Sequence, residues 1–204
     1  MLGLTRFPVL ALVGVLIFLV LGIAIGFLQS NSKAPAQLQQ GGPVLAPFQL
    51  VDHLGRAVSE RDMLGRPAVL FFGFTYCPDV CPVTLASLSA ALGKMGNDAG
   101  SIGVFFVSVD PERDTPTVLK AYLSAFDPRI RGLTGAPGQI AALAKSFGIY
   151  HAKANSGGES YTIDHTASVI LVDASGQFQA TIAYGENADV ALAKLQRLAR
   201  GEGG

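Results

Sequence analysis

The side chains of this sequence that could carry chemistry are concentrated in F-T-Y-C-P-D-V-C-P, the segment from Phe74 to Pro82, which holds both cysteines of the chain. A cysteine sulfur can act as a nucleophile, form a disulfide or bind a soft metal ion. Cys77 and Cys81 have the spacing C-x-x-x-C, whereas redox enzymes commonly use C-x-x-C. If the segment winds as one helical turn, the two Cβ atoms lie about 5–6 Å apart on one face. The pair could then share one metal ion, or close a disulfide after a small backbone adjustment.

The cysteines are predicted to lie between a buried strand and a helix. Ala68 to Phe74 is a nearly continuous apolar run rich in β formers, which is typical of a central strand covered on both faces. Beyond the cysteines, leucines recur at helical spacing at positions 85, 88 and 92. Pro82 suits the first helical turn, where its missing N–H costs no hydrogen bond. The predicted order is therefore strand, cysteine loop, helix.

The remaining pattern predicts an α/β domain with a mixed sheet. The further strands are an N-terminal hairpin beginning with Phe48–Gly55, a buried strand at Ile102–Val109, and a hairpin of Ala167–Val172 and Phe178–Ala183 around D-A-S-G. Two helices between them are marked by Leu119, Tyr122, Leu123 and Phe126 and by Ile140, Leu143, Ala144 and Phe147. A last helix carries Val190, Ala191, Leu195 and Leu198. Parallel units followed by an antiparallel hairpin give a sheet flanked by helices on both faces. This order is similar to the thioredoxin fold.

A third side chain that could bind a metal is His165, in Y-T-I-D-H-T from Tyr161 to Thr166. Thioredoxins place a cis proline against their cysteines just before the third core strand, but this sequence has no proline after Pro137. Because Y-T-I-D-H-T directly precedes the strand predicted at Ala167, we expect His165 to lie beside the cysteine loop. Taken alone, a histidine is more often an ordinary core or surface residue.

Two thiolates and one imidazole form a ligand set that suits copper. Thiolate sulfur selects Cu(I) and an imidazole completes a three-coordinate site, whereas structural zinc would need a fourth protein ligand that is not evident in the sequence. Whether Cu(II) is also bound stays open. Two other roles for Cys77 and Cys81 also stay open: thiol-disulfide exchange, and a redox-sensing or structural disulfide. A disulfide between them would close only a small loop and would therefore stabilise the fold only modestly.

Several charged residues and the other histidines have weaker assignments. Asp79 lies between the cysteines and Asp164 beside His165, so either carboxylate could orient a metal ligand or simply be solvated. The loop Asp110–Asp114 is expected either near the metal site or as the charged start of a helix capped by Asp114 or Thr115. We interpret His53 as a turn residue and His151 as a loop residue. Phe74 and Tyr76 are predicted to be packing residues.

The N-terminal part of the chain predicts a membrane anchor and a tether. Val9 to Leu28 lacks any charged or hydrogen-bonding side chain, and a bilayer core needs about 20 such residues in a helix. We therefore divide the chain into an anchor (1–28), a flexible tether (29–43) and a folded domain (44–204). The few flanking charges favour a cytoplasmic N-terminus and a domain in the periplasm. The sequence A-P-A at positions 34 to 36 leaves late cleavage open.

The charge balance argues against a polyanionic partner. The 15 Lys and Arg residues equal the 15 Asp and Glu residues in number, so the chain has no net charge that would attract nucleic acid.

Three motifs together resemble the Sco/SenC family: C-P-D-V-C-P after a buried strand, V-S-V-D-P-E-R-D-T-P from Val107 to Pro116, and Y-T-I-D-H-T. The resemblance covers 48–198 and implies a copper-binding assembly factor of cytochrome c oxidase rather than an enzyme. It implies copper ligation by Cys77, Cys81 and His165, copper donor proteins as partners, a single bacterial inner-membrane anchor, and copper delivery to the binuclear site of oxidase subunit II. Some relatives instead act as thiol-disulfide reductants.

Overall fold

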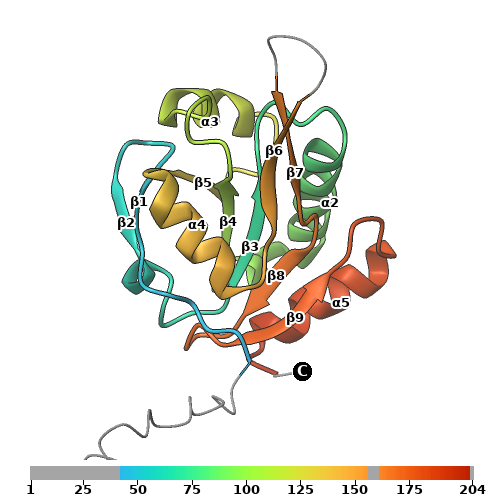
Figure 1. The fold of residues 1–204 in the computed structure, drawn as a ribbon. Coiled ribbons are helices and arrows are strands. Elements are labelled where there is room, and N and C mark those ends of the chain that lie inside the picture. The colour runs from blue at the N-terminus through green and yellow to red at the C-terminus, as the bar shows by residue number, and fades with distance from the viewer. Residues whose placement is uncertain (1–41, 156–160, 203–204) are drawn as a thin grey trace, which may run out of the picture. The chain divides into compact units, whose positions relative to one another are not determined.

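In the computed structural model, residues 42–155 and 161–202 are described; they belong to a unit spanning Gly41–Gly204. The strands are β1 (Gln49–Asp52), β2 (Ala57–Ser59), β3 (Ala68–Gly73), β4 (Gly103–Ser108), β5 (Ile130–Thr134), β6 (His151–Asn155), β7 (Tyr161–His165), β8 (Val169–Val172) and β9 (Phe178–Ile182). The helices are α2 (Val80–Met95), α3 (Pro116–Leu123), α4 (Pro137–Ser146) and α5 (Ala188–Ala199), with short 3-10 turns at Glu60–Asp62 and Gly96–Ser101. Figure 1 shows their arrangement.

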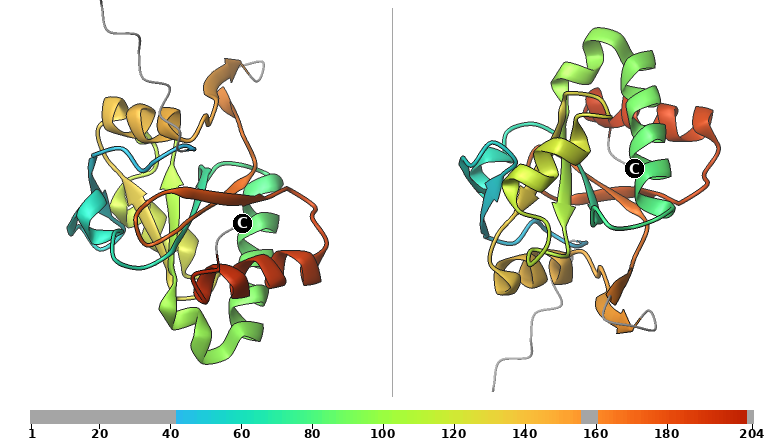
Figure 2. Two further views of the ribbon diagram at one scale, coloured as in Figure 1. Left: turned by 90° about the horizontal axis from the view of Figure 1, so that it is seen from below. Right: turned by 90° about the horizontal axis from the view of Figure 1, so that it is seen from above.

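A seven-stranded mixed sheet with the order β2-β1-β5-β4-β3-β8-β9 forms the centre of the domain. β3 pairs in parallel with β4 and antiparallel with β8, and all six of its residues are buried. α2 and α5 cover one face of the sheet and α4 covers the other (Figure 2). The predicted mixed sheet with helices on both faces is therefore confirmed, and β3 is an interior strand of it, with apolar side chains buried on both faces.

The predicted N-terminal hairpin is formed by β1 and β2, with Gln49 opposite Ser59. Gly55 has the positive φ of 79° that its turn requires. The turn is also held by Asp52, whose buried carboxylate accepts hydrogen bonds from the backbone N–H groups of Leu54 and Arg56. A single side chain thus closes the loop that lies between the two strands.

The C-terminal hairpin and helix also form as predicted, with one difference on the helix face. β8 and β9 are joined by D-A-S-G, where Asp173 accepts hydrogen bonds from the backbone of Ser175 and Gln177. In α5, Leu195 and Leu198 are buried, but Val190 is 47% exposed and does not belong to the packed face. Val190 lies in the first turn of α5, close to the helix end.

Two features of the structure are absent from the sequence-based prediction. β5 lies in the large sheet between β1 and β4, and it pairs in parallel with β4. β6 and β7 form a separate two-stranded antiparallel ribbon that protrudes from the body of the domain (Figure 2). The segment that carries His165 is therefore a strand of this ribbon.

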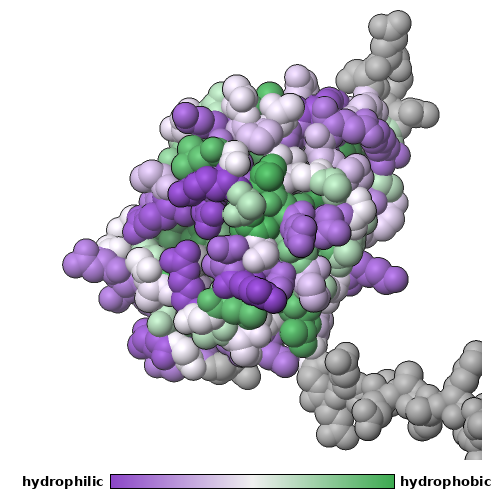
Figure 3. All heavy atoms as spheres, turned by 90° about the vertical axis from the view of Figure 1, so that its left-hand side faces the viewer, coloured by the Kyte–Doolittle hydropathy of each residue, from purple (hydrophilic) through white to green (hydrophobic). Residues whose placement is uncertain are grey.

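The surface shown in Figure 3 has hydrophilic and apolar residues interspersed, as is usual for a solvent-facing side of a domain. Within 42–155 and 161–202, none of the helices has the length and hydropathy needed to cross a bilayer. The expected anchor at 1–28 and most of the expected tether at 29–43 lie outside the described residues.

Candidate metal centre

The side chains of Cys77, Cys81 and His165 converge at one end of β3. Their sulfur and ring nitrogen atoms all lie within 4.8 Å of one another, and they form the one group of three such residues found among the described parts of the chain. Cys77 is in the loop that follows β3, Cys81 is in the first turn of α2, and His165 is the last residue of β7. Three separate elements therefore supply one site, as expected from the sequence.

The two sulfurs are brought together by the start of a helix rather than by a complete helical turn. α2 begins at Val80, so Cys77 precedes the helix and Cys81 lies inside it. The backbone N–H of Cys81 donates to Sγ of Cys77 at 3.4 Å. Asp79, the N-cap residue of α2, makes no capping hydrogen bond with its side chain among the described residues. Cys77 sulfur thus accepts a hydrogen bond from one of the free N–H groups at the helix N-terminus.

Cys81 lies at the bottom of the site, where its side chain is fully buried. Space for its sulfur is left by Gly73 at the end of β3. A Cβ atom at position 73 would lie 2.8 Å from Sγ of Cys81 and 2.8 Å from the Phe106 ring, closer than packed atoms approach. Glycine at this position is therefore required by the close approach of α2 to the sheet.

The ring of His165 is oriented by its own backbone and by aromatic packing. Nδ1 lies 3.0 Å from the carbonyl oxygen of Thr166, which can only accept, so Nδ1 carries a proton. In the neutral imidazole, Nε2 then has a free lone pair, and it faces Sγ of Cys81 at 3.5 Å. The Phe74 ring meets the imidazole edge-on at 5.8 Å between centroids. This tautomer leaves Nε2 available for a metal ion.

The two thiols differ in acidity. A hydrogen bond from the Cys81 side chain, opposed by burial and supported by the backbone N–H groups of Cys81 and Asp79, lowers the pKa of Cys77 to about 4. The same partnership with Cys77, together with burial, raises the pKa of Cys81. At neutral pH the apo site therefore holds a thiolate at Cys77 and a thiol at Cys81.

Of the residues with weaker assignments, Asp79, Asp164 and His53 have an environment that the sequence analysis allowed, and Tyr76 does not. Asp79 and Asp164 are exposed, and among the described contacts neither carboxylate reaches a cysteine or His165; the atom that orients His165 is the Thr166 carbonyl. Tyr76 is 64% exposed rather than packed in the core. His53 is a turn residue, as expected, and accepts a hydrogen bond from the N–H of Gly132.

The interpretation of His151 as a loop residue is wrong. His151 begins β6 and pairs in register with His165 across the ribbon. Burial lowers its pKa, and so does the neighbouring His165. The sequence H-A-K-A-N of β6 contains no large apolar side chain, so the strand could be identified only through its pairing with β7.

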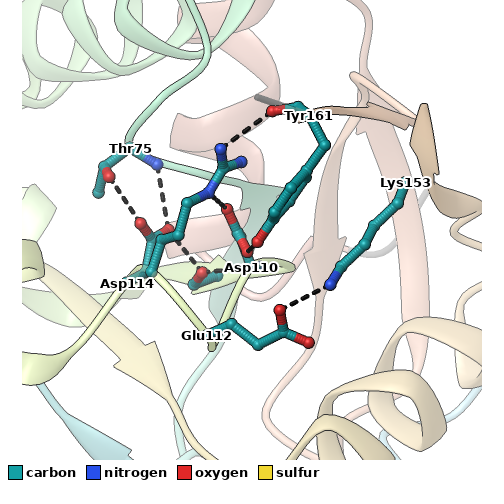
Figure 4. A network of polar contacts seen from close by, with 8 residues as sticks. Thr75, Asp110, Glu112, Asp114, Lys153 and Tyr161 are labelled. Atoms are coloured by element: carbon teal, nitrogen blue, oxygen red, sulfur yellow. Dashed lines mark hydrogen bonds and ion pairs between the residues drawn. The ribbon is translucent and has the colours of Figure 1, made fainter. Parts of the chain in front are cut away.

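The loop from Asp110 to Asp114 packs directly against the site, and both expectations for it hold in part. Thr115 caps α3 by accepting the N–H of Val118, and Pro116 is the first helical residue. Asp114 is fully buried and accepts hydrogen bonds from the backbone and hydroxyl of Thr75 in the cysteine loop (Figure 4). Burial raises the pKa of Asp114.

The arrangement as a whole fits a soft, thiophilic metal ion. It offers two sulfurs and one imidazole nitrogen, a set that suits Cu(I) in three-coordinate geometry. Two of the three ligand residues are only half buried, so the site is accessible from the surface. The helix N-terminus and the N–H groups around Cys77 stabilise a thiolate in either of its roles, as a ligand or as a nucleophile.

A family model described as SCO1/SenC matches residues 36–200. Protein SCO1 homolog 1, mitochondrial, of Arabidopsis thaliana is 38% identical over 145 residues, which cover 71% of this chain and 43% of that protein. Protein SenC of Rhodobacter capsulatus is 36% identical over 138 residues, covering 68% of this chain and 61% of that protein. The chain thus matches only about half of the length of these two relatives.

A solved structure of similar fold is that of Bradyrhizobium japonicum ScoI with copper bound. It superposes with a TM-score of 0.71 at 43% sequence identity, and the match covers 76% of this chain and 99% of that chain.

Proposed function

Because this chain belongs to the SCO1/SenC family, we propose that it binds Cu(I) through Cys77, Cys81 and His165 and delivers the ion to the binuclear copper site of cytochrome c oxidase subunit II. The observation that carries the proposal is the convergence of these three ligand atoms within 4.8 Å. The copper in the related ScoI structure and the family resemblance support it.

The geometry suits a carrier that must release its ion. A three-coordinate Cu(I) site leaves room for an incoming ligand from an acceptor, so one bond can form before another breaks. Cys77 is the more exposed of the two cysteines and Cys81 is fully buried. An acceptor would therefore replace Cys77 and His165 before it removes the ion from Cys81.

We further propose that the carrier works on the periplasmic side of a bacterial inner membrane. The support is the apolar segment Val9–Leu28 and the polar tether that follows it. Membrane fractionation of the full chain beside a version lacking residues 1–28 tests this, with only the full chain expected in the membrane fraction. Equal amounts of both in the soluble fraction would contradict the anchor.

Copper delivery is tested with the copper-loaded protein and the reduced, metal-free soluble fragment of subunit II. We expect two equivalents of Cu(I) to move to each fragment, measured by metal analysis after the proteins are separated. The visible absorption of the binuclear site should then appear when added ferricyanide removes one electron from the Cu(I) pair. The Cys77→Ser/Cys81→Ser variant, treated identically, should transfer nothing. If the loaded protein keeps its copper while free Cu(I) reconstitutes the fragment, the delivery role is wrong.

A second candidate function is reduction of a disulfide in the acceptor, and the unequal acidity of the two thiols favours it. In this reaction the Cys77 thiolate attacks the target disulfide and releases one target thiolate. The Cys81 sulfur then attacks Cys77, which frees the second target thiol and leaves a Cys77–Cys81 disulfide, a transfer of two electrons. Incubation with an oxidised subunit II fragment tests this role, and the absence of any thiol exchange would exclude it.

A further inference from the structure

The ribbon of β6 and β7 carries one of the three site residues but is not part of the large sheet. Its two strands hydrogen-bond only to each other within the described sheets. Two hydrogen bonds close the base of the ribbon: the N–H of Thr166 donates to the Tyr150 carbonyl, and the N–H of Tyr150 donates to the Thr166 hydroxyl. An isolated two-stranded ribbon has marginal stability in water, so its position over the cysteines depends on other contacts.

Those contacts come from loop 110–114. One is the ion pair between Lys153 of β6 and Glu112, at 2.6 Å (Figure 4), and it is exposed on both sides. The half-buried contacts are made by Arg113. Its Nη1 donates to the carbonyl oxygen of Tyr161 at 2.9 Å, and its guanidinium lies 3.8 Å from the centre of the Tyr161 ring. Its Nε donates to the buried carboxylate of Asp110. The Tyr161 hydroxyl donates to the other oxygen of Asp110 at 2.7 Å (Figure 4). Arg113, Asp110 and Tyr161 therefore form a closed set of charged and polar contacts.

Loop 110–114, which contains Asp110 and Arg113, also contacts the cysteine loop. Asp114, next to Arg113, binds Thr75, two residues before Cys77. The Arg113 guanidinium also lies 4.7 Å from the ring of Tyr76. Loop 110–114 is closed into a turn, because the N–H groups of Arg113 and Asp114 both donate to the Asp110 carbonyl.

We propose that Arg113 is a positioning residue that fixes the ribbon, and with it His165, against the cysteine loop. The inference rests on the proposed copper-binding function. Arg113 acts through the placement of His165 and supplies no ligand itself. The geometry that supports this is its simultaneous contact with Tyr161 of the ribbon and Tyr76 of the cysteine loop, with Asp110 holding the guanidinium between them.

A double-mutant cycle with His165 tests the proposal. We expect Arg113→Met to weaken Cu(I) binding, measured by competition with a chelator, by about tenfold or more, because charge-assisted contacts are lost. In a His165→Ala background, Arg113→Met should change the affinity little, since there is no longer an imidazole to position. An equal loss in both backgrounds would overturn the proposal, and so would an unchanged affinity in the single variant.

The matched control is Arg129→Met. Arg129 also binds an aspartate, Asp127, and a backbone carbonyl, that of Gly96, but it contacts neither the ribbon nor the cysteine loop. The Arg129→Met variant should have a lower free energy of unfolding and an unchanged Cu(I) affinity. Arg113→Lys, which keeps the charge beside Asp110 but not the planar fork, serves if Arg113→Met does not fold, and it should show a smaller loss of the same kind.

A readout on the metal-free protein separates this proposal from the proposed function. In the wild type, NMR should show contacts between the ring protons of His165 and Phe74, whose centroids are 5.8 Å apart. Arg113→Met should weaken these contacts, and Arg129→Met should not. If the wild type bound no copper, the proposed function would fail while this measurement still tested the positioning role. Unchanged contacts in Arg113→Met would refute it.

Discussion

Cys77 and Cys81 differ in their surroundings more than their spacing suggests. Cys77 lies at a helix N-terminus and accepts an N–H bond, while Cys81 is enclosed between α2 and the sheet. One sulfur is therefore held as a thiolate, ready to bind a metal or attack a disulfide, and the other as a thiol. The unequal pair suits both candidate functions, so they must be separated by experiment.

The thiolate at Cys77 should be visible in alkylation. Because the pKa of Cys77 is lowered to about 4, the reduced protein should react with iodoacetamide at Cys77 at a rate that is nearly independent of pH between 6 and 8, within about twofold. Mass spectrometry of digested samples can locate the label. A rate rising about tenfold per pH unit, with a midpoint near pH 8.5 as for an ordinary cysteine, would contradict this assignment.

The absence of a Cβ at Gly73 should contribute both to the stability of the fold and to Cu(I) binding. Gly73→Ala places a Cβ 2.8 Å from Sγ of Cys81, so we expect a loss of about 1–3 kcal/mol in unfolding free energy and weaker Cu(I) binding. Gly93→Ala is the control: position 93 is exposed in α2 with open space around it, and alanine there should stabilise by up to about 1 kcal/mol. Equal effects of the two variants in denaturant titrations would argue against the packing account.

At the level of elements, β1 depends on a buried charge. Asp52 is fully buried and binds Arg56 and Arg131, and although burial alone would raise its pKa, these hydrogen bonds lower it to about 2. Its ionised form is thus favoured in the folded state. The resulting stabilisation, about 2 kcal/mol, is fully present above the unfolded pKa near pH 4 and is lost as the pH falls through about 2.

Asp52→Asn should therefore lower the unfolding free energy by about 2 kcal/mol or more at pH 7, and the difference from wild type should shrink towards pH 2. Urea titrations at pH 7 and pH 2.5 measure both values. Glu202→Gln, which removes a solvent-exposed partner of Arg200, is the control and should change nothing measurable. A difference that stays constant with pH would show that the charge of Asp52 does not contribute.

The elements that could be predicted from the sequence are those whose own side chains define them. β3, β4 and α2 contain apolar runs or helical spacing that determine burial locally. β5, with the sequence I-R-G-L-T, was missed because Arg131 and Gly132 interrupt its pattern. Glycine at position 132 lets α3 pack closely on β5, because a Cβ there would lie 2.6 Å from a terminal methyl group of Leu123, which would have to move. That requirement comes from tertiary packing, which a local pattern does not contain.

The sequence predicts the metal ligands of the site but not the contacts that hold those ligands in place. The motifs identify Cys77, Cys81 and His165, which the structure brings together. For Asp79 and Asp164, where the sequence left open whether they orient a ligand or are solvated, the structure shows exposed carboxylates. The residues that hold the site belong to loop 110–114 and to the ribbon, and their pairing over distances of tens of residues leaves no local signal. A charged loop directly after a buried strand was the one available indication.

For the molecule as a whole, the large sheet positions two cysteines at the end of β3, and a separate two-stranded ribbon brings His165 to them. Membership of the SCO1/SenC family and the copper in a related structure agree with that design.

The measurement that tests the central claim most directly is X-ray absorption spectroscopy of the reduced protein loaded with one equivalent of Cu(I). We expect two sulfur ligands and one nitrogen ligand in the wild type, and in His165→Ala the loss of the nitrogen together with a large loss of affinity, because Nε2 is the one imidazole nitrogen that faces Cys81. Sulfur-only coordination in the wild type, or an unchanged affinity in His165→Ala, would contradict the three-residue copper site.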